Sequence, residues 1–339
     1  MHTEANLIAR LARIIPSATA GHGAKGIALG IGDDAAVLRW ARARDCVVST
    51  DGFIEGRHFL ARIHSPDAVG FKALARAASD LAAMGATPRY FLLTLSLPRG
   101  KAGTWLEQFA RGMAVAARRL QMRLIGGDIS SHERVVAALT VMGEVRRGKM
   151  LTRRGGRPGD AIYASGRLGA AQAGLEMMLR SGRADGSTLR RSYALARHMY
   201  PVPRVELGGW LAGRGLATAA MDLSDGLSTD LARLCAASGV GAVVHAAALP
   251  VARDDGPGTR RRNAANAEGA ELRRALHGGE DYELLFCVRP RLASRIPSGF
   301  RGVPITRIGE LTAGGTVMLE ENGRTRPLRP GGWEHFAGR

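Results

Sequence analysis

The sequence is poor in cysteine and in long apolar runs, and each shortage excludes a class of protein. Its 339 residues contain 3 cysteines, Cys46, Cys235 and Cys287. An odd, widely spaced set supports neither a disulfide framework nor a paired-cysteine zinc site, which predicts a reduced, cytoplasmic setting. No run of about 18 apolar residues occurs, and charges are scattered through residues 1–16, so we expect neither a membrane span nor a secretion signal.

Aromatic residues are also scarce, at 5% of the chain, although the formal net charge is +18. A basic surface favours nucleic acid because Lys and Arg displace counterions from phosphates. Single-strand binders also need aromatic platforms on which bases stack, and no run here interleaves aromatic residues with Arg or Lys. We therefore expect a solvated, arginine-rich surface that attracts anionic substrates, rather than a nucleic-acid partner.

Two common nucleotide-binding motifs are missing or misplaced. The segment Gly21–Gly26 fits a GxGxxG pattern, but it follows a loop-like stretch instead of a strand. A Walker A sequence is absent, and the nine histidines show no HExxH spacing. Any nucleotide must therefore be held by other residues.

The chain does contain aspartates that recur after apolar runs. They are Asp33, Asp34, Asp51, Asp128, Asp222 and Asp225, and Ser79-Asp80 lies within a predicted helix. Strands expected at 46–50 and 123–125 end shortly before two of these positions. Each aspartate alone could be a turn or a helix cap, but carboxylates gathered at strand ends would repel one another without cations. Oxygen-only clusters suit magnesium and phosphates.

A helix expected over 67–84 carries Lys72, Arg76 and Asp80 at intervals of four residues. This spacing predicts a face on which Arg76 and Asp80 form a salt bridge. It does not explain why Ser79-Asp80 lies within an apolar run, where an unpaired charge would be costly.

Strand and helix signals alternate along the chain, which predicts an α/β fold. The breaker-rich segment 146–160 predicts a boundary between domains at 1–147 and 148–339. In the second half, a strand expected at 217–223 leads into Ser224-Asp225-Gly226 and a helix. The polar stretch Arg253 to Glu271 is expected to be a flexible loop.

The motif-bearing segments carry a family resemblance. In chain order they are Gly32-Asp33-Asp34-Ala35, Ser49-Thr50-Asp51, Glu55-Gly56-Arg57-His58, Ser79-Asp80-Leu81, Gly126-Gly127-Asp128, Leu151-Thr152-Arg153, Asp222-Leu223-Ser224-Asp225-Gly226, Gly279-Glu280-Asp281-Tyr282 and Gly332-Trp333-Glu334. Together they closely resemble the thiamine-monophosphate kinase family of the aminoimidazole ribonucleotide synthetase superfamily. The matches keep the order of the family and span nearly the whole chain.

The resemblance implies a two-domain α/β (α+β) fold. The N-terminal domain would bind ATP and magnesium and form a β-barrel across a homodimer, and the C-terminal α/β domain would complete the active site. The implied reaction is direct transfer of the ATP γ-phosphoryl group to thiamine monophosphate, giving thiamine diphosphate. Such a transfer depends on alignment between metal ions. The acceptor phosphate is already largely ionised, so no dedicated general base is required.

The resemblance also implies roles for individual residues. Magnesium ligands would be Asp33, Asp34, Ser49, Thr50, Asp51, Asp80, Asp128, Asp222 and Asp225, with Asp51 and Asp225 closest to the chemistry. ATP contacts would be Gly127, Asp128, Arg153 and Ser224. Contacts to thiamine monophosphate would be His58, Glu280 and Trp333.

Two positions depart from the family pattern. Ile129-Ser130 stands where two threonines are expected, and Arg57 precedes His58 where the family often has a small or apolar residue. The rival interpretations are another ATP-using enzyme of the superfamily and a non-catalytic basic module. A selenophosphate synthetase would need a reactive N-terminal cysteine, and a hydrogenase maturation protein would need a C-terminal one. An aminoimidazole ribonucleotide synthetase is a third rival interpretation within the superfamily.

Overall fold

The computed structural model describes residues 4–16, 27–29, 37–38, 40–181, 192–253 and 264–333. The chain divides into two compact units. Unit 1 comprises Met1–Leu81 and Ala86–Gly148, and unit 2 comprises Ala82–Gly85 and Lys149–Arg339. Among the described residues, no helix combines the length and the apolarity needed to cross a membrane.

Unit 1 is built on a sheet with the strand order β3-β6-β4-β5. These strands are β3 (Arg44–Ile54), β6 (Val136–Arg146), β4 (Thr87–Leu97) and β5 (Arg123–Ser131). Only the β4–β5 pair in this sheet is parallel. Smaller elements of the unit are α1 (Glu4–Ile14), β1 (Ile27–Leu29), β2 (Val37–Leu38) and η1 (Arg99–Lys101).

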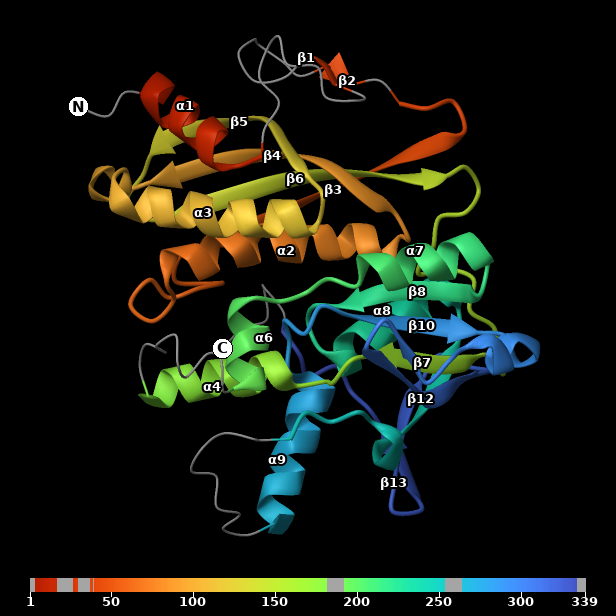
Figure 1. The fold of residues 1–339 in the computed structure, drawn as a ribbon. Helices are drawn as coiled ribbons and strands as arrows, with labels where there is room; N and C mark the ends of the chain where they lie inside the picture. The colour runs from red at the N-terminus through yellow and green to blue at the C-terminus, as the bar shows by residue number, and fades with distance from the viewer. Residues whose placement is uncertain are drawn as a thin grey trace. The chain divides into compact units, whose positions relative to one another are not determined.

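Two helices, α2 (Pro66–Ala83) and α3 (Thr104–Arg119), cover one face of this sheet (Figure 1). Their axes approach closely because glycines stand at the contact. A Cβ on Gly70 would lie 1.9 Å from the Phe109 carbonyl oxygen, and one on Gly112 would lie 1.8 Å from that of Asp67. No side chain fits there, so the two glycines allow the helix backbones to touch.

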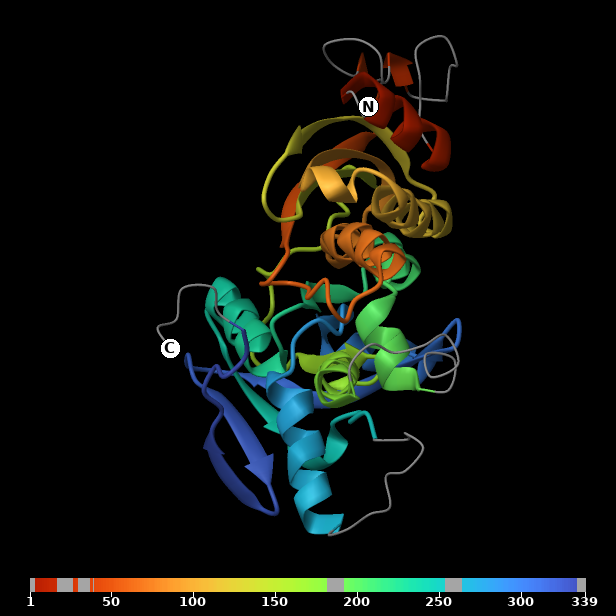
Figure 2. The same cartoon turned by 90° about the vertical axis from the view of Figure 1, so that its left-hand side faces the viewer.

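Unit 2 contains a larger sheet with the strand order β14-β13-β9-β12-β7-β10-β8, and β11 pairs with β12. The strands are β7 (Ala161–Ser165), β8 (Ala217–Leu223), β9 (Gly241–His245), β10 (Glu283–Val288), β11 (Gly299–Phe300), β12 (Val303–Thr312), β13 (Val317–Glu321) and β14 (Arg324–Pro327). The β13–β14 hairpin, drawn in deep blue, forms one edge of this sheet (Figure 2).

Both faces of the unit 2 sheet carry apolar cores. Its helices are α4 (Ala170–Ser181), α6 (Tyr193–Met199), α7 (Val205–Arg214), α8 (Leu227–Ser238) and α9 (Ala264–His277), with 3-10 turns η2 (Ala246–Ala248) and η3 (Pro290–Arg295). Side chains of α8 and α9 pack with Met221 and Leu285 on one face. Side chains of α7 pack with Ala220 and Phe286 on the other. Neighbouring strand residues therefore serve opposite cores, as strand geometry requires.

The mixed α/β prediction is confirmed, but two local expectations are wrong. The strands expected at 46–50 and 123–125 are parts of β3 and β5, so Asp51 and Asp128 lie within strands instead of after them. The expected loop up to Glu271 contains the start of α9, because Ala, Glu, Leu and Arg favour helix and Leu276 anchors it in the core. Residues 254–263 are outside the described ranges. The dimeric barrel stays a prediction.

Candidate functional site

In unit 1, β3 and α2 bring two acidic side chains close to oppositely charged or polar partners. Arg76 donates to both carboxylate oxygens of Asp51, from Nε at 2.6 Å and from Nη2 at 3.0 Å. The Ser49 hydroxyl donates to Asp80 Oδ2 at 2.5 Å. Ser49 and Asp51 are two apart on a strand, and Arg76 and Asp80 are four apart on a helix, so each pair shares a face. The Arg76–Asp80 salt bridge expected from the spacing gives way to these cross-element bonds.

The fork from Arg76 holds the Asp51 carboxylate in one orientation. The Asp51 side chain is still 25% exposed, and that of Arg76 is 13% exposed. The guanidinium also lies over the Phe53 ring, 5.2 Å from its centroid. A bidentate pair on an aromatic face is well ordered, because both planar groups are constrained. Asp51 is therefore pre-oriented.

Side chains of β3 alternate between the faces of the sheet, so Ser49, Thr50 and Asp51 do not all point the same way. Asp51 is paired with Leu139 of β6, which is paired with Leu93 of β4, and both leucines are buried under the helices. On the other face, the Thr50 hydroxyl accepts a hydrogen bond of 3.4 Å from β6. The structure groups Ser49, Asp51 and Asp80, and it turns the Thr50 side chain away from them.

Gly127 and Asp128 lie on β5, at the edge of the sheet opposite β3. The register through Thr94 places the exposed Asp128 side chain on the same face as that of Thr50. A Cβ on Gly127 would lie 2.0 Å from the Leu93 carbonyl oxygen, so only glycine allows this pairing of β5 with β4. Asp128 is thus presented on an exposed strand surface.

The departure at Ile129-Ser130 has a structural reason. Ile129 is buried, and its neighbours Asp128 and Ser130 are exposed on the other face of β5. A hydroxyl at position 129 would point into the core beneath the sheet. The Ser130 hydroxyl lies 2.8 Å from that of Ser96. The departure therefore adds packing and leaves the exposed face polar.

His58 lies in the turn after β3. Its Nδ1 accepts the backbone N–H of Ile54 at 3.0 Å, and its ring lies 5.8 Å from that of Phe53. The tautomer with the proton on Nε2 follows from that bond. Asp33 and Asp34, the remaining proposed ligands of the first half, are outside the described residues.

In unit 2, the loop between β8 and α8 carries Ser224 and Asp225. One oxygen of Asp230 accepts three consecutive backbone N–H groups, from Ser224 at 3.1 Å, Asp225 at 3.0 Å and Gly226 at 3.1 Å. Burial raises the pKa of Asp230 to about 6, and the N–H groups and Arg233 oppose that rise. Arg233 bonds to the carboxylates of both Asp225 and Asp230.

The same loop gathers two other predicted site residues through its carbonyl groups. The Ser224 oxygen accepts the N–H of Glu280 at 2.8 Å, and the Asp225 oxygen accepts the N–H of Trp333 at 3.0 Å. The Trp333 residue is 41% exposed. Ser224, Asp225, Glu280 and Trp333 therefore lie together, although they come from three distant parts of the sequence.

Asp222 lies within β8 and Arg153 lies beside it. Strand β8 forms the edge of the unit 2 sheet opposite the β13–β14 hairpin. The backbone before Arg153 runs beside this strand, since the Thr152 carbonyl accepts the N–H of Ala220 at 2.8 Å. The Arg153 side chain is exposed, while Asp222 is buried within β8 at 4% exposure. Arg153 can offer its guanidinium to an anion from this position.

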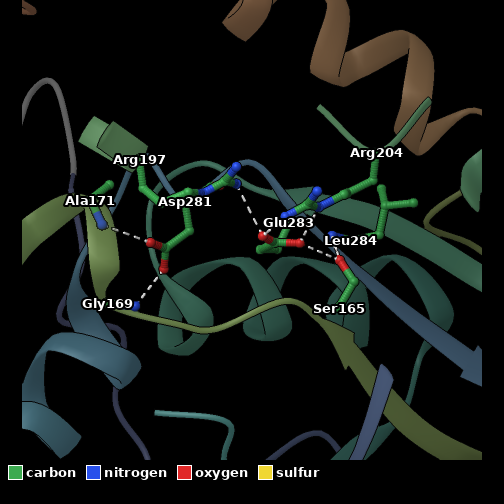
Figure 3. A network of polar contacts seen from close by, with 8 residues as sticks. All are labelled: Ser165, Gly169, Ala171, Arg197, Arg204, Asp281, Glu283 and Leu284. Carbon is green, nitrogen blue, oxygen red and sulfur yellow. Dashed lines mark hydrogen bonds and ion pairs between the residues drawn. The ribbon is translucent and has the colours of Figure 1, made fainter. Parts of the chain in front are cut away.

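The segment between Glu280 and β10 is held by a buried ionic network (Figure 3). Glu283 accepts bonds from Ser165 at 2.6 Å, Arg197 Nη2 at 3.0 Å and Arg204 Nε at 2.5 Å. Arg197 also donates to the Asp281 carbonyl at 3.2 Å. Glu280 and Tyr282 have φ values of 68° and 50°, and residues other than glycine rarely adopt this backbone conformation. The network therefore holds strained backbone in place.

The Asp281 carboxylate anchors the start of α4. It accepts the N–H groups of Gly169 at 2.6 Å and Ala171 at 3.1 Å. Burial raises its pKa to about 7, and the two N–H groups act in the opposite direction. Sequence reasoning did not identify Asp281, Asp230 or Arg76 as functional, because their partners lie far away in the sequence or in the loop backbone.

The residues of unit 1 suit magnesium in their chemistry. Ser49, Asp51 and Asp80 supply hydroxyl and carboxylate oxygens, the donors that this ion prefers. Among the described residues, no group of three or more His, Cys, Asp or Glu side chains is close enough to hold a metal by itself. Any ion bound here would therefore also need hydroxyl, backbone, water or phosphate oxygens, as is usual for magnesium.

Comparison with known proteins gives consistent matches over the chain. The family model "AIR synthase related protein, N-terminal domain" matches residues 32–145, and the corresponding C-terminal model matches 157–320. The thiamine-monophosphate kinase of Escherichia coli (strain K12) is 40% identical over 317 residues, which cover 92% of this chain and 93% of that protein.

Two solved structures share the fold. The crystal structure of thiamine-monophosphate kinase from Stenotrophomonas maltophilia K279a has a TM-score of 0.76 and 35% identity, covering 93% of this chain and 95% of that one. AaThiL complexed with AMPPCP and TMP has a TM-score of 0.73 and 30% identity, covering 88% and 89%. These matches confirm the two-domain fold expected from the resemblance.

Proposed function

The chain belongs to the thiamine-monophosphate kinase family, and from this premise we propose that it transfers the γ-phosphoryl group of ATP to the phosphate of thiamine monophosphate, the last step in making thiamine diphosphate. The observation that carries the proposal is the match over 88% of the chain to AaThiL, which was solved with AMPPCP, an ATP analogue, and TMP. In the reaction, a phosphate oxygen attacks the γ-phosphorus, the bond to the β-phosphate oxygen breaks, and ADP leaves.

Unit 1 would contribute oriented negative charge. Asp51, Ser49 and Asp80 would hold one magnesium ion. Thr50 and Asp128 lie on the other face of the sheet, so as proposed ligands they would serve a separate ion. Asp33 and Asp34 are further proposed ligands. Bound magnesium would neutralise charge on the phosphates. Arg76 keeps the Asp51 carboxylate in one rotamer, and this limits the reorientation needed when a cation arrives.

Unit 2 would contribute contacts to both substrates. Arg153 and Ser224 are proposed to contact ATP, and Asp222 and Asp225 are proposed as magnesium ligands. Glu280 and Trp333, together with His58 of unit 1, are proposed to contact thiamine monophosphate. An exposed indole suits the cationic thiazolium ring, because the face of an aromatic ring attracts cations.

We also infer a homodimer in a cytoplasmic setting. Strand β3 lies at an edge of the unit 1 sheet and exposes 58% of Val48 and 38% of Ile54. Large apolar side chains on an open strand edge favour pairing with a second chain. Light scattering coupled to gel filtration would test this, with Val48→Lys expected to shift the protein toward monomer. An unchanged dimer would place the interface elsewhere.

The assay for the activity uses purified protein, ATP, magnesium and thiamine monophosphate, with thiamine diphosphate followed by chromatography. Asp51→Asn should abolish most turnover. Asp45→Asn is the matched control on the same strand, because Asp45 pairs with the exposed Arg147 at 3.3 Å. Consumption of ATP without formation of thiamine diphosphate would refute the assignment of thiamine monophosphate as the substrate. Full activity of Asp51→Asn would refute the role of that carboxylate.

A further inference from the structure

The carboxylate of Asp230 occupies a place that elsewhere binds anions. Three consecutive N–H groups converge on its Oδ2 at 3.0–3.1 Å, and the residue is completely buried. Such concave sets of backbone N–H groups often hold phosphate. Here the protein's own side chain fills the site, so these N–H groups are closed to a substrate phosphate. The loop can contribute only its side chains and carbonyl groups.

Those carbonyl groups receive the two segments that carry Glu280 and Trp333. Glycines allow both approaches, since a Cβ on Gly332 would lie 1.9 Å from the Asp225 oxygen and one on Gly279 would lie 2.7 Å from the Ser224 oxygen. Each carbonyl shares its peptide plane with the N–H of the next residue: the Ser224 carbonyl with the Asp225 N–H, and the Asp225 carbonyl with the Gly226 N–H. Asp230 holds those planes from the opposite side, through their N–H groups.

The segment that ends in Trp333 is also tied to the first turn of α8. The N–H of Gly332 donates to the Thr229 hydroxyl at 3.1 Å, and that of Gly331 donates to the Ser228 hydroxyl at 3.2 Å. Arg233, one turn further on, bonds to the carboxylates of Asp225 and Asp230. The loop, its carboxylate and the Trp333 segment are therefore parts of one hydrogen-bonded assembly.

We propose that Asp230 is a positioning residue for phosphoryl transfer, which acts through the Ser224–Gly226 loop to orient Asp225, Glu280 and Trp333 together. The proposal rests on the proposed function for the roles of those three residues. It predicts that a magnesium ligand and the contacts to thiamine monophosphate depend on one side chain that touches neither substrate.

The test compares Asp230→Asn with Asp160→Asn. Asp160 is a matched control because it is also buried, at 2%, and accepts a backbone N–H at 3.1 Å and the Thr218 hydroxyl at 2.7 Å, without contacting the loop. Both variants should lose thermal stability. Kinetics measured well below both melting temperatures should show kcat/KM falling for both substrates in Asp230→Asn by up to about 100-fold, the cost of misplacing reacting groups by about 1 Å. Asp160→Asn should stay within about twofold of wild type, since no reacting group moves.

A double-mutant cycle separates positioning from stability. Trp333→Ala should raise KM for thiamine monophosphate several-fold in the wild type and much less in Asp230→Asn, because the indole is already misplaced there. Additive effects, or kcat/KM of Asp230→Asn near wild type despite lower stability, would overturn the proposal.

Hydrogen exchange gives a readout that does not depend on activity. In Asp230→Asn, the amides of Ser224, Asp225, Glu280 and Trp333 should all exchange faster, whereas Asp160→Asn should leave them protected. If the wild type failed to make thiamine diphosphate but these amides responded together, the proposed function would fall and the structural linkage would stand. Unchanged protection at Glu280 and Trp333 would refute the linkage itself.

Discussion

Replacing Glu283 by Gln should destabilise unit 2 strongly, since two arginines would lose their shared counter-charge. The Glu283 side chain is 0% exposed, and those of Arg197 and Arg204 are 9% and 11% exposed. Removing one partner of such a buried set leaves an uncompensated charge and costs about 3–5 kcal/mol. A Gln amide also places a donor group against arginine donors, so at least one bond becomes a repulsion.

The cost can be translated into a melting temperature. Each kcal/mol shifts the midpoint by about 2–4 °C in a domain of this size, so the transition of unit 2 should fall by about 6–20 °C. Differential scanning calorimetry, together with near-ultraviolet circular dichroism, would measure it. Two transitions are expected, because the chain has two compact units.

The matched control is Glu206→Gln. Glu206 pairs with Arg301, but both side chains are more than 60% exposed, at 63% and 65%. An exposed pair contributes at most about 1 kcal/mol, so this variant should melt within about 4 °C of wild type. A Glu283→Gln protein that melts as high as Glu206→Gln would refute the reasoning that burial sets the cost.

Three further predictions follow from the same geometry. Gly70→Ala should destabilise unit 1 by about 1–3 kcal/mol because its Cβ would lie 1.9 Å from the Phe109 oxygen, while Gly209→Ala, with nothing within 4 Å, should be neutral or stabilising in chemical denaturation. Trp333→Ala should raise KM for thiamine monophosphate and leave KM for ATP nearly unchanged; equal effects on both would contradict its assignment. Burial, then the charges of Arg326 and Arg273, lower the pKa of His277 in the folded protein. The unfolded chain therefore binds this proton more readily, and the free energy of unfolding should fall as the pH drops below about 6.5. His277→Asn should flatten that pH dependence of stability, and an unchanged profile would refute the reasoning.

Much of the fold could be predicted from the sequence, since local patterns carried it. The helix α2 was expected within one residue of its bounds, and β8 with its following loop was expected as found. The β13–β14 hairpin was not predicted, because its exposed, arginine-bearing strand has no apolar alternation to signal it. The start of α9 was interpreted as a loop on polarity alone, although its residues are good helix formers.

The candidate site was only partly predictable. The motifs indicated which residues are candidates for substrate and metal binding, but not which other residues fix the positions of those side chains. Arg76 meets Asp51 across two elements, and Asp230 acts on backbone N–H groups, which no side-chain pattern reveals. The family resemblance also implied that Ser49, Thr50 and Asp51 are all magnesium ligands. Strand alternation separates Thr50 from its neighbours, which periodicity could have indicated once the strand was known to continue to Ile54.

Because side chains of β3 alternate between the two faces of the sheet, the register of this strand with β6 matters as much as its composition. A substitution at Ser49, Thr50 or Asp51 alters one group, but a single-residue deletion between Arg44 and Ser49 could be absorbed by slipping the strand past β6. Such a slip would send every following side chain to the opposite face, which would bury the hydroxyl of Thr50 and expose both groups that meet α2. The strand should therefore tolerate conservative replacement far better than any change of length.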